Sequence, residues 1–160
     1  YLKVKTLNLI LIPLFMVSTL TQLNKNKFVN WDLDPVYGYD FPEKTVILTP
    51  MNYENVQLKT RCKIVANNET INSIPYNPQI KTKVIDVMKN IYGIDYYNPI
   101  EKKYPGTKPI WYKKLWENNT QDEWIRLSRL YKFNYIITPK DWNLNLKLIS
   151  DSHDNNLYRI

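Results

Sequence analysis

The chain has 160 residues, which is enough for one membrane segment and one domain of about 120 residues with a single hydrophobic core. Its formal charge is +7, but four lysines beside an apolar stretch supply most of it, and from Phe28 onward 18 Lys and Arg face 15 Asp and Glu. That balance is ordinary for a solvated surface and argues against a nucleic-acid partner. Cys62 is the only cysteine, which excludes an internal disulfide and a cysteine-based zinc site. We predict no metal and no cofactor.

The N-terminal region is dominated by an uncharged stretch of 19 residues, Thr6 to Asn24. As a helix it would extend about 28 Å, close to the thickness of a bilayer core, and its apolar side chains leave no polar face. We predict a transmembrane helix within residues 1–24. Because the chain begins at Tyr1 rather than Met, we expect this helix to be the last of several in a longer protein. The alternative is a signal peptide, although no Ala-x-Ala-like cleavage site follows the stretch. Two lysines on each side leave the orientation undecided.

A linker and two short strands come next. Residues 25–42 have no regular periodicity and are predicted to be a linker, whose aromatic residues either lie at the headgroup level or pack on the domain. Thr45 to Thr49 form a β-branched apolar run that ends at Pro50, and Cys62 to Ala66 form a second run. Both are predicted to be strands, separated by a short polar helix within Asn52 to Lys59.

Helical patterns dominate the middle of the chain. Pro78 begins a predicted helix that ends at Gly93, with apolar residues at helical spacing. Residues 94–119 are difficult to interpret, although 111–116 fit one or two helical turns. Thr120 and Glu123 have the spacing of a capping box, which predicts a helix carrying Trp124, Leu127 and Tyr131 on one face.

Strands return at the C-terminal end. Residues 135–138 form a predicted strand, and residues 144–149 and 157–160 form a hairpin around a polar turn. These elements predict an α/β domain over residues 43–160, a small three-layer mixed sheet with a parallel centre and the C-terminal hairpin at one edge.

The sequence contains no recognised catalytic motif, and three glycines are too few for a glycine-rich phosphate loop. The turn from Thr49 to Tyr53 follows a strand, where open α/β sheets usually place ligands. Arg61 stands just before the second strand, where it would bind an anion or pair with a carboxylate. His153 is the only histidine and lies in a polar turn, where a solvated side chain is expected.

Five segments from Phe41 onward carry a family resemblance: FPEKTVILTP, VQLKTRCKIV, IPYNPQIKTKVIDVMKNIYG, DEWIRLSRLYKFNYIITPKDW and NLYRI. Their order resembles the soluble C-terminal domain of uncharacterised bacterial polytopic membrane proteins, some related to GT-C-type glycosyltransferases. The resemblance implies an extracytoplasmic domain without a catalytic site of its own, in the bacterial inner membrane. Whether the complete protein is an enzyme stays open.

Two alternatives remain for the function. In the first, the domain assists a membrane glycosyltransferase that uses lipid-linked sugars; in the second, it is a secreted or anchored binding module. For the first, anionic headgroups or the phosphate of a lipid-linked sugar would meet basic side chains, and aromatic rings would stack on the sugar. The candidate ligand-binding residues are Arg61, Trp111, Tyr112, Lys113 and Trp116. Packing of these rings into the core is the competing prediction.

Overall fold

A computed structural model describes residues 34–97 and 110–160. The chain divides into two compact units, residues 1–32 and 33–160, and only the second is described below. The predicted membrane segment and residues 25–33 of the predicted linker lie outside the described residues. Within the described ranges, no helix has the length and apolar character needed to cross a bilayer.

The second unit is a mixed α/β fold whose five strands form one sheet in the order β2-β1-β3-β5-β4. β1 pairs in parallel with both β2 and β3, whereas β5 is antiparallel to β3 and β4. The predicted mixed sheet with a C-terminal hairpin at one edge is therefore confirmed. The parallel pairs occupy the half of the sheet from β2 to β3 rather than its centre, because β3, the central strand, is antiparallel to β5. In chain order the elements are β1 (Val46–Leu48), α2 (Val56–Thr60), β2 (Lys63–Ile64), α3 (Asn68–Asn72), the 3-10 helix η1 (Pro78–Ile80), α4 (Lys81–Tyr92), α5 (Ile110–Asn118), α6 (Gln121–Tyr131), β3 (Tyr135–Pro139), β4 (Lys147–Asp151) and β5 (Asn155–Arg159).

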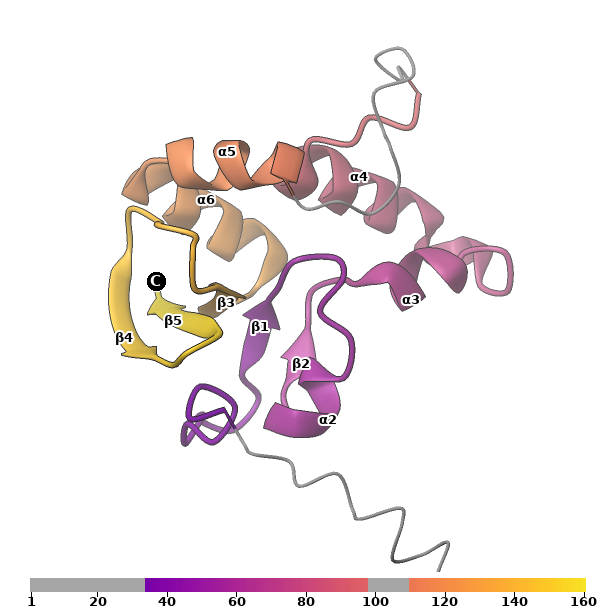
Figure 1. The fold of residues 1–160 in the computed structure, drawn as a ribbon. Helices are drawn as coiled ribbons and strands as arrows, with labels where there is room; N and C mark the ends of the chain where they lie inside the picture. The colour runs from indigo at the N-terminus through magenta and orange to yellow at the C-terminus, as the bar shows by residue number, and fades with distance from the viewer. Residues whose placement is uncertain (1–33, 98–109) are drawn as a thin grey trace, which may run out of the picture. The chain divides into compact units, whose positions relative to one another are not determined.

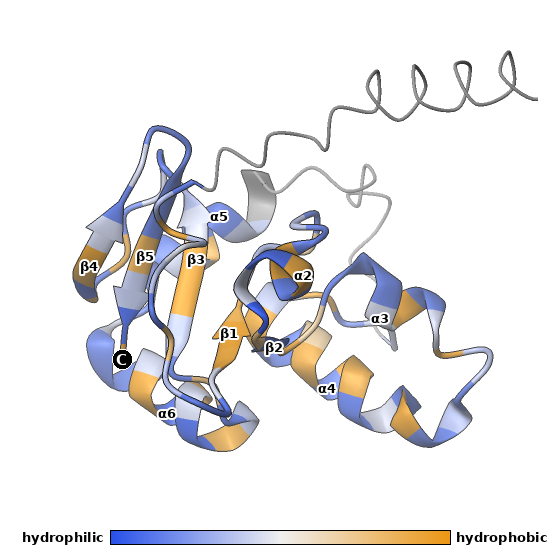
Figure 2. Ribbon diagram, turned by 90° about the horizontal axis from the view of Figure 1, so that it is seen from below, coloured by the Kyte–Doolittle hydropathy of each residue, from blue (hydrophilic) through white to orange (hydrophobic). Residues whose placement is uncertain are grey.

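The inner strands β1, β3 and β5 are buried on both faces, as their apolar residues require. Successive residues of a strand point to opposite faces, so Ile47 and Leu48 enter different cores. One core lies between the sheet and helices α4, α5 and α6, and the other lies between the sheet, α2 and residues 36–41. Figure 1 shows α4, α5 and α6 grouped on one side of the strands, and Figure 2 shows that β1 and β3 are strongly hydrophobic.

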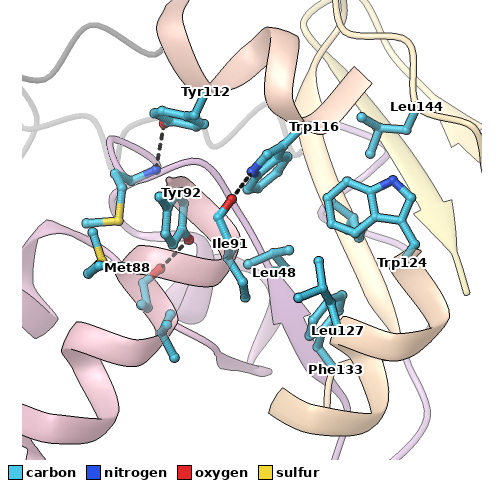
Figure 3. Packing of buried hydrophobic residues seen from close by; sticks show 14 of the residues in the cluster. Leu48, Met88, Ile91, Tyr92, Tyr112, Trp116, Trp124, Leu127, Phe133 and Leu144 are labelled. Carbon is cyan, nitrogen blue, oxygen red and sulfur yellow. Dashed lines mark hydrogen bonds between the residues drawn. The ribbon is translucent and has the colours of Figure 1, made fainter. Parts of the chain in front are cut away.

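The larger core is organised around Trp116, which is fully buried on α5. Its indole N–H donates to the carbonyl of Ile91 at 2.8 Å, joining α5 to α4. Its ring packs edge-to-face against Trp124 and Trp142, with centroids 5.5 and 5.3 Å apart. Tyr92 and Tyr112 complete the cluster (Figure 3). Such aromatic pairs add to the stabilisation from area burial, so the aromatic cluster helps to hold α4, α5 and α6 together.

The helix termini confirm several predictions. Gly93 ends α4 with a φ of 68°, the left-handed conformation that glycine adopts without strain. Thr120 caps α6 by accepting a hydrogen bond from the Glu123 N–H. The reciprocal half of the predicted capping box is not formed, because the Glu123 carboxylate binds Arg126 instead.

Other boundaries differ from the predictions. β2 is shorter than the predicted strand and leaves Cys62, which is buried, just outside it. Helix α3 was not predicted, although Asn67 and Thr70 form a complete capping box at its start. The hairpin strands are shifted towards Asp151 and Asn155, because the turn needs only residues 152–154.

Residues 34–41 extend the compact unit beyond the predicted domain start at residue 43. Val36 is fully buried, and Tyr39 and Phe41 pack against Tyr135 with centroids 6.0 and 5.3 Å apart. The described aromatic residues of the predicted linker therefore pack on the sheet, which was one of the two expectations for them. We call residues 34–41 the strap.

The core position of Trp124 allows a direct test. Trp124 is fully buried between α6 and the sheet, so truncation leaves a cavity. In the chain shortened to residues 30–160, Trp124→Ala should lower the free energy of unfolding by about 3–5 kcal/mol. Urea denaturation measures this change. Arg126→Ala is the control and should have little effect, because its ion pair with Glu123 is exposed. Equal stability of the two variants would contradict the packing of α6.

Candidate functional site

The structure distributes the predicted ligand-binding residues over three places. Tyr112 and Trp116 belong to the buried aromatic cluster, where Trp116 is fully buried and Tyr112 is 3% exposed. The ring of Tyr112 is not open to solvent, and its hydroxyl accepts a hydrogen bond from the Met51 N–H at 3.0 Å. This arrangement agrees with the core-packing alternative for these two rings. The side chain of Trp111 lies outside the described residues.

Lys113 lies beside the carboxyl end of β3. Its ammonium binds the Asp141 carboxylate at 2.7 Å and lies 3.8 Å from Glu117. The hydrogen bond to Asp141 is the main reason that the pKa of Lys113 is raised. Because Lys113 already has two carboxylate partners, a phosphate group would have to compete with both.

A polar network closes the carboxyl ends of β1 and β3, where an open α/β sheet usually binds ligands. Asn155 is its centre: its amide oxygen accepts from the Tyr53 hydroxyl at 2.6 Å, and its amide nitrogen donates to Asp34. Ser152 also donates to the Asp34 carboxylate, at 2.7 Å. Asp34 begins the strap, so the chain's own N-terminal segment is bound at this edge.

The phenols of the network are unsuited to proton transfer at neutral pH. Burial, reinforced by Asp34, raises the pKa of Tyr37 to about 12. Burial likewise raises the pKa of Tyr53, and neighbouring Tyr37 and carboxylates add to the effect. These hydroxyls therefore stay protonated, and that of Tyr53 donates a hydrogen bond to Asn155, which in turn binds the strap through Asp34.

Arg61 lies at the opposite end of the strands, along the edge of the sheet where the parallel strands begin. It is exposed, and a salt bridge to it is found nowhere in residues 34–97 or 110–160. The structure thus shows no carboxylate partner for Arg61 among the described residues, which leaves anion binding as the prediction still to be tested.

Five further cations gather at the same edge as Arg61. The pairing register places Arg159 opposite Tyr135, the first residue of β3, and Lys147 opposite Arg159. All six are exposed, and the described part of the chain offers none of them a salt bridge. We call this set the basic edge; its members are Lys44, Arg61, Lys63, Lys132, Lys147 and Arg159.

A groove of about 530 Å³ opens on part of the basic edge. Its lining combines Lys44, Arg61 and Lys63 with the rings of Tyr39 and Phe41, and it also includes Asp40 and Glu43. Cations beside aromatic edges suit a ligand that carries negative charge next to an apolar or sugar part. The basic edge is therefore the candidate functional site.

Three cations of the basic edge have unusual backbone conformations. Lys44, Arg61 and Lys132 have φ values of 63°, 57° and 62°. Glycine or asparagine is usual in this left-handed region, which strains most other side chains. Arg61 and Lys132 follow α2 and α6, where a positive charge also complements the helix dipole. Even so, each position retains a long cation where a smaller residue suits the backbone better.

Sequence inspection found only Arg61 of this set. The other five cations are separated by up to 115 positions in the chain, between Lys44 and Arg159, and no local motif joins them. The available signal was a basic residue in or near each predicted strand, and these residues share one edge only once the strand order and directions are known.

A metal-binding role has no support from the described side chains, because among residues 34–97 and 110–160 no three His, Cys, Asp or Glu residues are grouped to hold an ion. His153 is exposed in the β4–β5 turn and contacts Asp154.

Comparison of the chain with protein-family models, with curated proteins and with solved structures gives no match. The candidate site therefore rests on its geometry.

Buried tyrosines make stability dependent on alkaline pH. Burial is the main cause that raises the pKa of Tyr37, Tyr112 and Tyr131 from 10.0 to about 12. The folded state thus holds these protons more tightly than the unfolded state, and the stabilisation is complete below pH 10. We expect the free energy of unfolding of residues 30–160 to fall as the pH rises from 10 towards 12. Urea denaturation over this range measures it; a flat profile would contradict the tyrosine environments, and Tyr37→Phe should reduce the slope.

The left-handed residues predict unusual tolerance of glycine. Lys44→Gly, Arg61→Gly and Lys132→Gly should each leave the free energy of unfolding unchanged or raise it by about 0.5–1 kcal/mol, because glycine relieves the strain at positive φ. Lys63→Gly is the control: it lies in β2, where glycine weakens a strand. Thermal or urea unfolding measures all four variants, and a loss of stability at the three left-handed positions comparable to that at Lys63 would contradict the strain.

Proposed function

We propose that residues 34–160 form the extracytoplasmic, non-catalytic domain of an integral membrane protein, anchored by the apolar stretch Thr6 to Asn24. The observation that carries this proposal is the position of that stretch, which ends nine residues before a separate compact unit begins at Leu33. A run without charges between lysine pairs is typical of a segment that spans a bilayer.

The organisation of the domain supports this proposal. Both hydrophobic cores are built from residues after Leu33, so the domain has its own source of stability. Its exposed candidate site, the basic edge, is suited to binding anions rather than to proton transfer, since lysine and arginine are protonated at neutral pH. Binding is accordingly the role we propose for the domain.

An accessory role in a membrane glycosyltransferase is the second proposal. The basic edge supports its phosphate-binding part, because Arg61 could contact the phosphate of a lipid-linked sugar. The proposed sugar stacking has no support from Tyr112 and Trp116, whose rings are buried. A sugar at the basic edge would instead meet Tyr39 or Phe41, which line its groove.

Membrane extraction tests the proposed anchor. The full chain should sediment with membranes and resist an alkaline carbonate wash, and its mature N-terminus should retain Leu7 to Leu23. Leu11→Arg with Phe15→Arg should release it, because each arginine at the centre of a spanning helix costs about 2.5–3.5 kcal/mol. Leu11→Ala with Phe15→Ala is the matched control and should stay anchored.

Recovery of the unaltered chain in the soluble fraction after gentle lysis would overturn the proposal. Loss of residues 7–23 from the mature chain would instead support the cleaved signal peptide and a secreted binding module. Protease access in intact cells then decides whether the domain is extracytoplasmic.

A further inference from the structure

We propose that the basic edge binds the anionic phospholipid headgroups of the bilayer that anchors the chain. This inference rests on the proposed membrane anchoring and names the partner of the candidate site. It starts from six exposed cations that share one edge of the sheet, with no salt bridge to any of them among the described residues. Elsewhere in the domain, Lys113, Lys140 and Arg126 are paired with carboxylates. Other exposed cations without a salt bridge among the described residues, such as Lys81, Lys83 and Arg129, lie on the helices rather than along the ends of the strands.

The domain has opposite charges at the two ends of its strands. At the basic edge, Asp40 and Glu43 are the acidic residues that line the groove beside three of the six cations. The opposite edge carries Asp34, Asp141, Asp151 and Asp154, with Lys113 and Lys140 bound to two of these carboxylates. A negatively charged membrane surface attracts the basic edge and repels the acidic one, so it favours a single orientation of the domain.

The shape of the basic edge favours several headgroups over one compact anion. The six cations are distributed over the ends of all five strands, which spread them over roughly 20 Å at the usual strand spacing. A single phosphate contacts only a few donors at once, whereas an array of headgroups can meet the whole row. The half-buried rings of Tyr39 and Phe41 stand beside the cations, and aromatic rings are favoured at the level of headgroups.

The tether is long enough for this contact. Residues 25–33 can extend to about 30 Å, whereas a strand of five residues measures about 17 Å. Either end of the strands can therefore reach the surface of the bilayer, and charge decides between the two edges.

The test uses the full chain reconstituted in two sets of nanodiscs, one of phosphatidylcholine alone and one that also contains phosphatidylglycerol. Lysine acylation, followed by mass spectrometry, reports the accessibility of each ammonium. Lys44, Lys63, Lys132 and Lys147 should react about fivefold more slowly in the anionic discs, as expected for attraction of each cation to an anionic surface. Lys113, Lys114 and Lys140 should react equally in both sets, and high salt should remove the difference.

A triple variant tests which charges carry the contact. Lys44→Gly, Arg61→Gly and Lys132→Gly remove three cations at positions where glycine suits the backbone, so unfolding does not explain their effect. The protection of Lys63 and Lys147 should then disappear. Lys113→Gln, Lys114→Gln and Lys140→Gln remove the same charge from residues outside the basic edge and should leave the protection intact.

Each result separates this inference from the proposed anchoring. Equal acylation in both sets of nanodiscs, with the chain stably incorporated, overturns headgroup binding and leaves the anchor in place. Failure of the chain to enter nanodiscs overturns the anchor and, with it, this inference. Protection of the edge by an added oligonucleotide but not by phosphatidylglycerol assigns the surface to nucleic acid and likewise overturns it.

Discussion

The burial of Trp116 is the constraint on which the rest of the domain depends. The indole is fully buried, and its N–H donates a hydrogen bond to the Ile91 carbonyl, which fixes the position of α5 against α4. Trp124 and Trp142 then pack against the same ring from α6 and from the segment after β3. α4, α6 and the segment after β3 thereby share one anchor on α5. The larger core consequently covers one face of β1, β3 and β5, although α5 and α6 are short helices.

The opposite face of the sheet is covered in a different way, and this difference decides where function can lie. Only α2 and the strap cover it, and the strap is fixed at its start by Asp34 through Ser152 and Asn155. These bonds occupy the carboxyl ends of the strands, the usual ligand position in open α/β sheets. The basic edge, whose six exposed cations have no salt bridge within residues 34–97 and 110–160, lies instead at the amino ends of the parallel strands. The most common rule for finding a site in this class of fold therefore points to a structural contact in this domain.

The sequence predicted individual helices and strands better than the segments that connect them. The helix ending at Gly93 and the hairpin after β3 were recognised because periodicity, capping residues and turn residues act over a few neighbouring positions. α3 was missed because its apolar content is low and its only strong signal is the Asn67 cap. The predicted linker was too long. The strap forms neither a helix nor a strand, so its packing on the sheet leaves no pattern of secondary structure in the sequence.

The sequence by itself determined an α/β domain with a mixed sheet and a C-terminal hairpin, the burial of Trp124, and an apolar stretch suited to a membrane. These follow from local periodicity and hydrophobicity, which a single segment carries alone. Only the tertiary structure decided that Tyr112 and Trp116 are buried, that Asp34 closes the carboxyl edge, and that Arg61 shares an edge with five other cations. The physical reason is that burial and charge clustering depend on which strands become neighbours, and strand order is set by packing between residues far apart in the chain.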